Sequence, residues 1–199
     1  MNYIKMLITI VILSLFLLIL KLNTKKYNYI DLYQKYTPDY KEKYENLLDT
    51  YELIKDKYVF IPSQIIGFSN YKVNNIFYLN SGLNNGVKEN SYVVSEDGLV
   101  GIVSKSYKTY SVAQLISSEN INIAVEINGC YGSLNKQLIS DLINCDDINI
   151  NDPVFTSKYS ISSSNILVGY IDKIKDDKIL IRYAYNPYKI RYVGIVYDN

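Results

Sequence analysis

Three patterns of hydrophobic and polar positions follow one another along the chain. Residues 6–20 form an uncharged apolar run, and residues 37–58 repeat apolar or aromatic side chains at intervals of four and three. The remainder consists of short β-branched or aromatic runs separated by turn residues. These patterns are typical of a membrane span, an amphipathic helix and a series of strands, respectively. The sequence therefore predicts an anchor, a helix and an all-β body, in that order.

The apolar run 6–20 is short for a hydrocarbon core of about 30 Å. Counted from Tyr3 to Leu22 the segment suffices, because Lys5 and Lys21 can extend their ammonium groups to the two interfaces. No small-residue cleavage site follows, which favours an uncleaved anchor over a secretory signal peptide. We assign residues 1–26 to a short N-terminus and a single transmembrane anchor, whose orientation the balance of lysines leaves open.

The predicted helix begins at Thr37, which can cap it, and Pro38, which fits its first turn. Its apolar positions form one narrow heptad seam, typical of a coiled coil. The seam residues are Tyr40, Tyr44, Leu47, Tyr51, Ile54 and Tyr58. We therefore interpret residues 27–58 as a coiled-coil helix that pairs weakly in a homodimer, since most seam residues are tyrosines whose hydroxyls need water or a partner. The alternative is a helix that lies on its own globular domain.

The β body occupies residues 59–199. The predicted strands are 59–68, 76–80, 91–95, 99–103, 111–116, 121–127, 153–157, 166–174, 178–185 and 192–197. Asp97 and Gly98 predict a type I′ hairpin turn, Gly129 and Gly132 a corner, and residues 135–152 a long loop or a weak strand pair. No convincing helix separates the strands, so the pattern predicts a barrel or sandwich, divided into two subdomains somewhere within 128–152.

Composition removes most enzymatic chemistry from consideration. The chain has no His, which excludes Ser-His and Cys-His hydrolases and histidine-ligated zinc. The acid pairs 146–147 and 176–177 are adjacent in sequence, and we interpret them as a loop and a hairpin turn.

Cys130 and Cys145 are interpreted as two small buried side chains, with a disulfide as the alternative. The net charge is +1 and no basic stripe for nucleic acid is present. We assign no catalytic, metal-binding or cofactor-binding residue, and the residues alone indicate a membrane-anchored binding or scaffolding module.

The segment 79–127 resembles the signature region of the family of the rod-shape-determining protein MreC. Its strands alternate with a glycine, an Asn-Gly-Val and a Gly-Leu-Val-Gly-x-Val, and Asp-x-Val-x-Thr-Ser and Val-Gly-Tyr-Ile follow later in the chain. The matching turn positions are Gly82, Gly86, Gly98, Gly101, Asp152 and Gly169. The order of anchor, helix and β body also agrees with that family.

This resemblance implies a dimeric scaffold of the cell-elongation and peptidoglycan-synthesis machinery, without enzymatic activity or cofactor. It implies two small β-barrel subdomains outside the cell membrane, with the N-terminus in the cytoplasm. The implied partners are a penicillin-binding transpeptidase, a RodA-type polymerase, MreD- or RodZ-like membrane proteins and MreB filaments. The alternative function is a membrane-fusion adaptor of an efflux or secretion system, a class that needs a long helical hairpin where this sequence predicts one helix.

Overall fold

The computed structural model describes residues 49, 58–69, 75–143, 145, 147–175, 178–187 and 189–198. The chain divides into two compact units, Met1–Lys41 and Glu42–Asn199, and all described residues belong to the second. The predicted anchor lies outside them, as does the predicted helix apart from its exposed helical residue Asp49 and its last residue, Tyr58. Within the described ranges, no helix has the length and apolar character needed to cross a membrane.

Twelve strands and one short 3₁₀ helix make up the described part of the chain. The first barrel contains β1 (Tyr58–Phe68), β2 (Ile76–Leu79), η1 (Leu83–Asn85), β3 (Tyr92–Ser95), β4 (Gly98–Ser106), β5 (Ser111–Leu115) and β12 (Tyr192–Asp198). The second contains β6 (Asn122–Ile127), β7 (Cys130–Asn135), β8 (Leu138–Ile143), β9 (Pro153–Thr156), β10 (Leu167–Lys175) and β11 (Lys178–Tyr183). The all-β body and its two barrels are thus confirmed.

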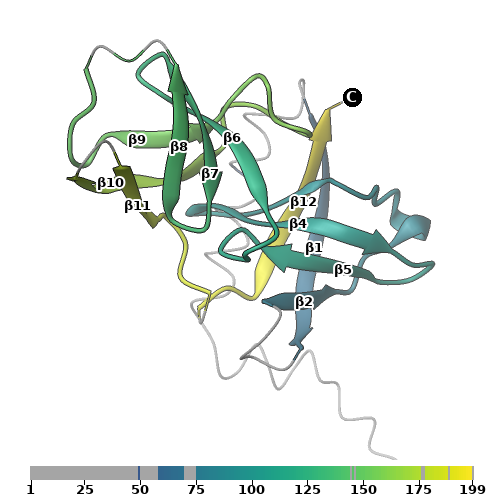
Figure 1. Ribbon diagram of the computed structural model, residues 1–199. Helices are drawn as coiled ribbons and strands as arrows, with labels where there is room; N and C mark the ends of the chain where they lie inside the picture. Colours follow the sequence, from purple (N-terminus) through teal and green to yellow (C-terminus); the bar gives the residue numbers. More distant parts are fainter. Residues whose placement is uncertain are drawn as a thin grey trace, which may run out of the picture. The chain divides into compact units, whose positions relative to one another are not determined.

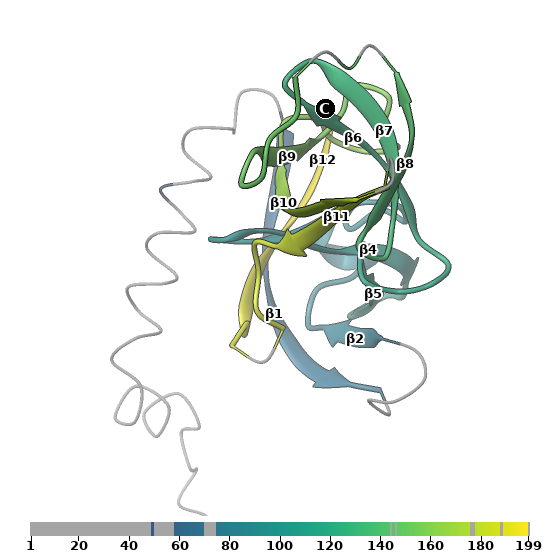
Figure 2. The same ribbon diagram turned by 60° about the vertical axis from the view of Figure 1, so that its left-hand side comes forward.

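Both barrels are closed, and the second is inserted into the first (Figure 1). The strand orders are β1-β12-β3-β4-β5-β2 and β10-β11-β8-β7-β6-β9. Strand β1 pairs antiparallel with β12 from Tyr58 opposite Asp198 to Gln64 opposite Tyr192, and Figure 2 shows the two strands side by side. The chain therefore leaves the first barrel after β5, builds the whole second barrel, and returns to close the first.

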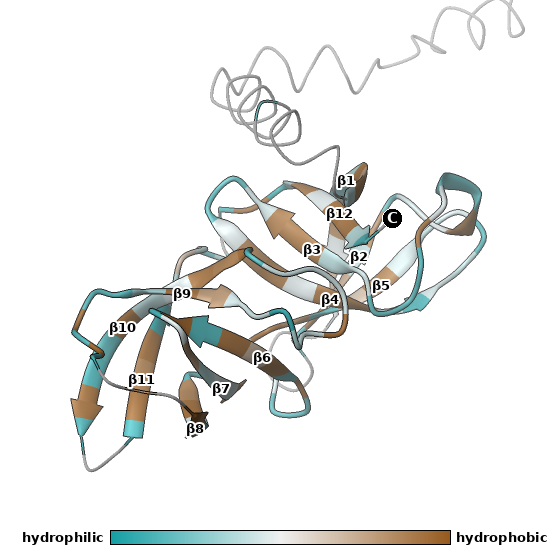
Figure 3. Cartoon of the chain, turned by 90° about the horizontal axis from the view of Figure 1, so that it is seen from above, coloured by the Kyte–Doolittle hydropathy of each residue, from teal (hydrophilic) through white to brown (hydrophobic). Residues whose placement is uncertain are grey.

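In β2, β5, β6, β9 and β11 alternate residues are buried, whereas β3 and the first four residues of β4 are buried throughout. Figure 3 shows hydrophobic residues, in brown, interleaved with paler ones along the strands. In β6, Ile123, Val125 and Ile127 are buried, whereas the residues between them are not. Phe77, Leu79 and Leu99 fill the first barrel in the same way. Side chains fill the interior of both barrels, and their buried residues belong to one hydrophobic cluster.

The boundary between the barrels differs from the prediction. We expected a break within 128–152, but β6 already belongs to the second barrel, so the chain crosses at 116–121 and again at 184–191. Strand β8 corresponds to the weak strand predicted within 135–152, and β7 replaces the predicted glycine corner. Asn128 and Gly129 have φ of 49° and 86° and connect Ile127 to its partner Cys130, which is the conformation of a two-residue type I′ turn.

The predicted hairpin between β3 and β4 is confirmed, but its turn is shifted by one residue. Ser95 pairs with Gly98, so the central residues are Glu96 and Asp97. Neither has a positive φ, and the predicted type I′ turn is therefore wrong. Gly98 is the residue that needs glycine, because its φ is 141°.

Candidate functional site

Of the predicted dimerisation seam, the structure describes only the last residue, Tyr58. Tyr58 is the first residue of β1 rather than the end of a helix, because its backbone enters the ladder with β12. Its side chain is buried, and its hydroxyl donates a hydrogen bond of 2.7 Å to the carbonyl of Ser164. Tyr58 thus joins the two barrels and does not belong to a helical seam. The other seam residues, Tyr40, Tyr44, Leu47, Tyr51 and Ile54, lie outside the described part of the chain.

The predicted turn glycines Gly82 and Gly86 flank η1. The N–H of Gly82 donates to Asn85 Oδ1 at 3.1 Å, and Gly86 ends the turn with a φ of 86°. A Cβ added to Gly82 would lie 2.6 Å from the backbone N of Tyr110. Gly82 therefore allows the close packing of η1 against the turn between β4 and β5, and Gly86 ends η1 in the left-handed conformation.

Gly98, Gly101 and Gly169 lie where two backbones or a backbone and a ring approach closely. A Cβ on Gly98 would overlap the carbonyl oxygen of Leu167 in the second barrel. On Gly101 it would lie 2.8 Å from the Phe77 ring, and on Gly169 it would overlap the carbonyl of Arg182. These three glycines therefore allow close approaches within and between the barrels, and their role is structural.

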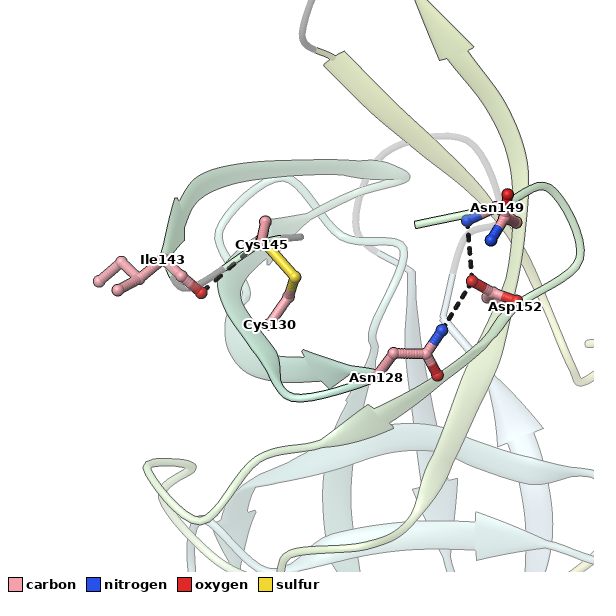
Figure 4. Close-up of a disulfide and its surroundings, with 6 residues drawn as sticks. All are labelled: Asn128, Cys130, Ile143, Cys145, Asn149 and Asp152. Carbon is pink, nitrogen blue, oxygen red and sulfur yellow. Dashed lines mark hydrogen bonds between the residues drawn. A yellow bond between two sulfur atoms is a disulfide. The ribbon is translucent and has the colours of Figure 1, made fainter. Parts of the chain in front are cut away.

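Asp152 and the two cysteines fasten the connection between β8 and β9 (Figure 4). Asp152 Oδ2 accepts hydrogen bonds of 2.8 Å from Asn128 Nδ2 and from the N–H of Asn149. Cys130 and Cys145 form a disulfide with Cα atoms 4.8 Å apart, so our interpretation of two separate buried cysteines is wrong. The reason is the strand that we did not predict: β7 begins at Cys130 and pairs with β8, which brings the chain after Ile143 back beside it.

The connection between β9 and β10 joins the second barrel to the first through serine residues. Beside the bond from Tyr58 to Ser164, Ser162 Oγ donates to the carbonyl of Val196 in β12 at 3.3 Å. Tyr92 of β3 contacts the same loop: burial raises the pKa of its phenol, and hydrogen bonds with Ser160, Ile161 and Ser162 oppose that rise. Sequence reasoning missed this loop, because a run of serines predicts only a polar connection.

The two crossings form a cleft of about 310 Å³ beside the second barrel, lined by Ser117, Lys136, Gln137, Tyr183, Tyr185 and Pro187. Burial raises the pKa of Tyr185 to about 12, against an opposing hydrogen bond with Ser117. The hydroxyl of Tyr183 donates to the carbonyl of Lys136, and the carbonyl of Ile116 lies 3.4 Å from the same hydroxyl oxygen. These tyrosines therefore tie the first crossing to the second barrel and remain protonated near neutral pH.

The aromatic patch, defined as Tyr131, Ile143, Lys158 and Tyr159, is a set of mutually contacting side chains on the surface of the second barrel. Tyr131 and Ile143 are cross-strand partners on one face of β7 and β8. Tyr159 packs edge-on against Tyr131 with ring centroids 5.3 Å apart. Ile143 and Tyr159 are 61% and 67% exposed, values unusual for side chains of this size.

Lys158 gives the aromatic patch a positive charge. Its Nζ lies 5.3 Å from the Tyr131 ring centroid and 5.1 Å from that of Tyr159. Both rings hold the ammonium by cation–π attraction, and Tyr131 followed by Tyr159 raises the pKa of Lys158. An exposed set of aromatic, aliphatic and cationic side chains is typical of a protein-binding surface.

No group of three or more His, Cys, Asp or Glu side chains that could hold a metal ion occurs among the described residues. Of the two predicted acid pairs, only Asp147 is described, and it is exposed. The chemistry available at the described surfaces is that of recognition: stacking, apolar contact and charge.

Comparison with known proteins gives one family and several structures. The family model "Rod shape-determining protein MreC, barrel core" matches residues 65–197. No curated protein matches the chain. The fold is similar to the major periplasmic domain of the cell shape-determining filament MreC in its monoclinic form, at 21% identity and a TM-score of 0.66, covering 71% of this chain and 99% of that one. A second structure of MreC has 19% identity and a TM-score of 0.69, with 80% of this chain and 98% of that chain covered.

A third similar structure is the complex between penicillin-binding protein PBP2 and MreC from Helicobacter pylori. Its identity to this chain is 20% and its TM-score 0.57, with 70% of this chain and 98% of that chain covered.

Proposed function

Because the chain belongs to the family of the rod shape-determining protein MreC, we propose that it is a membrane-anchored, dimeric scaffold of the cell-elongation machinery. The observation that carries the proposal is the complete pair of barrels that matches the family's barrel core. A scaffold acts by raising the effective concentration of its partners at one place. It therefore needs binding surfaces and a tether.

The tether is the predicted anchor within residues 1–26, and the dimer would form through the predicted helix 27–58. In this arrangement the N-terminus is cytoplasmic and the barrels are extracytoplasmic. The disulfide between Cys130 and Cys145 supports that placement, because disulfides persist in oxidising compartments. Leu47→Asp is expected to weaken the dimer, since a carboxylate in an apolar seam lacks a partner.

The partner that we propose for the barrels is a penicillin-binding transpeptidase, acting with a RodA-type polymerase. The solved complex of PBP2 with a similar MreC supports this class of partner. MreD- or RodZ-like membrane proteins would connect the anchor to MreB filaments. Of the described surfaces, the aromatic patch offers the exposed aromatic and aliphatic anchors that protein interfaces use.

A capture experiment tests the contact surface. Ile143→Asp places a charge in the aromatic patch and is expected to reduce capture of the penicillin-binding protein from solubilised membranes at least tenfold. Ile150→Asp is the matched control, because Ile150 is also an exposed isoleucine of the second barrel, 58% exposed against 61% for Ile143. Equal capture by both variants and the wild type would exclude the aromatic patch as the contact.

A complementation experiment tests the scaffold. In rod-shaped cells depleted of this protein, the full chain is expected to restore rods, whereas secreted residues 58–199 should leave the cells round although the barrels are folded and abundant. The variants Asp146→Asn/Asp147→Asn and Asp176→Asn/Asp177→Asn in the full chain should still restore rods. Restoration by the untethered barrels would contradict the scaffold.

A further inference from the structure

One end of the first barrel carries exposed apolar and aromatic side chains on a rigid support. The tip, as we call it, consists of Leu83 of η1, Tyr107 and Tyr110 of the turn between β4 and β5, and the lysines Lys88, Lys105 and Lys108. Figure 1 shows η1 beside the end of this hairpin. The neighbouring second barrel contributes no residue to it.

Backbone hydrogen bonds join the two segments of the tip. The N–H of Leu83 donates to the carbonyl of Tyr107 at 2.8 Å, and the N–H of Asn84 to that of Lys108 at 3.0 Å. The turn itself is closed by a 2.9 Å bond from the N–H of Tyr107 to the carbonyl of Tyr110. Gly82 lets the turn approach η1 this closely. Hydrogen bonds between the two backbones therefore fix the positions of η1 and the turn, and with them the positions from which the side chains of the tip extend.

The apolar side chains of the tip face water. Leu83 is 60% exposed, Tyr107 36% and Tyr110 37%. The two tyrosine rings stack with centroids 4.6 Å apart and an interplanar angle of 15°. These exposed Leu and Tyr side chains contribute little to the stability of the fold. They suit a partner whose surface offers an apolar region for the leucine beside a polar region for the tyrosine hydroxyls.

The charges of the tip are mainly positive. Lys88, Lys105 and Lys108 are exposed, and the acid in this part of the described surface is Glu89, whose carboxylate accepts a 3.5 Å bond from the N–H of Ser106. Lys105 Nζ lies 5.3 Å from the Tyr107 ring centroid, so its charge sits next to the aromatic pair. The tip thus combines one aliphatic side chain, two tyrosines and three lysines with one acid.

We propose that the tip binds the interface of an anionic lipid membrane. Tyrosine rings prefer the headgroup level, a leucine reaches the acyl boundary, and lysines complement anionic headgroups. A leucine that is 60% exposed favours lipid over a glycan, because a glycan would be bound by polar side chains around the aromatic rings. The inference goes beyond the proposed function. It rests on that function only for the identity of the membrane that the tip can reach.

The chain has no Trp, so a single introduced tryptophan reports the environment of the tip in the full protein. We place the full chain in nanodiscs of phosphatidylglycerol that contain brominated lipid. The emission of Tyr107→Trp is expected to shift to the blue and to be quenched at least twofold. Tyr159→Trp, an exposed position in the second barrel, is the matched control and should show neither effect. Equal quenching at both positions, or no quenching at position 107, would overturn the proposal.

A vesicle-binding assay of residues 42–199 separates this inference from the proposed function, because it needs no anchor, dimer or synthase. These residues form one compact unit with two closed barrels and one shared hydrophobic cluster. Each lysine contributes about fivefold to binding of an anionic surface, so Lys105→Gln/Lys108→Gln should weaken binding to phosphatidylglycerol vesicles about 30-fold. Leu83→Ser should also weaken it, and the melting temperature should stay unchanged because these side chains are exposed. Binding to anionic cell-wall polymer but not to vesicles would overturn the proposal.

Discussion

Gly98→Ala adds one methyl group at a point where the two barrels meet. It tests whether the stability of the protein depends on the close approach of Gly98 to Leu167. At φ of 141°, an alanine is strained by about 1–3 kcal/mol. Its Cβ would also overlap the Leu167 carbonyl and lie 3.4 Å from Ala184 Cβ, and overpacking of this kind costs about 1–3 kcal/mol more. We expect a loss of about 4 kcal/mol in the free energy of unfolding, or about 12 °C in melting temperature for a body of this size.

Three other glycines separate the two effects. Gly129 has a positive φ of 86° with nothing near its added Cβ, so Gly129→Ala should cost about 1 kcal/mol. Gly169→Ala overlaps backbone without a positive φ and should cost about 2 kcal/mol. Gly67→Ala meets neither obstacle and should change the stability by less than about 0.5 kcal/mol.

The assay is denaturant unfolding of residues 27–199, followed by circular dichroism and by tyrosine fluorescence. Gly98→Ala should be the least stable of the four variants by a clear margin. If it matches Gly129→Ala, the strain is confined to the backbone of one turn, and the close approach of the two barrels at this position is refuted.

The remaining predictions concern the second barrel and its crossings. Cys145→Ser opens a loop of 15 residues and should lower the free energy of unfolding by about 3 kcal/mol, after which a reducing agent should have no further effect on the melting temperature. Burial raises the pKa of Tyr185 to about 12 from 10.0 in the unfolded chain, so its contribution of about 3 kcal/mol is present below pH 10 and lost as the pH rises towards 12. Unfolding measured from pH 9 to 12 should accordingly be less pH-dependent in Tyr185→Phe than in the wild type. Asp152→Ala removes the acceptor for two hydrogen bonds and should cost about 1 kcal/mol in a melting experiment, whereas Asp152→Asn should cost less.

The strands that could be predicted from sequence are those with a clear apolar pattern. All ten predicted runs overlap a strand, because β-branched and aromatic residues alternate along them and fill a barrel. Strand β7, with the sequence CYGSLN, escaped prediction because only two of its residues face the core. The dipeptide Asn128-Gly129 just before it is a strong hairpin signal, and giving it that weight would have revealed both β7 and the proximity of the cysteines.

The exposed surfaces could not be predicted in the same way. Leu83, Tyr107 and Tyr110 become neighbours only when η1 packs on the hairpin turn, and Tyr131 and Tyr159 meet across a loop of the second barrel. Sequence periodicity describes which face of a strand is buried, whereas these contacts depend on pairings between segments far apart in the chain. The placement of Tyr58 failed for the opposite reason: its spacing suits a helix, but pairing with β12 overrides the local pattern.

If the barrels are exported as proposed, with the N-terminus retained in the cytoplasm, the insertion of one barrel into the other sets the order in which their strands emerge. Strand β1 emerges early, yet its partner β12 lies more than a hundred residues later, so the first barrel stays open until translocation is nearly complete. The second barrel is built from one continuous stretch, β6 to β11, and can close while the last strand is still inside the cell. A premature stop before β12 would then leave a folded second barrel beside a first barrel in which β1 pairs only with β2, and quality-control proteases can recognise the open edges of β1 and β3.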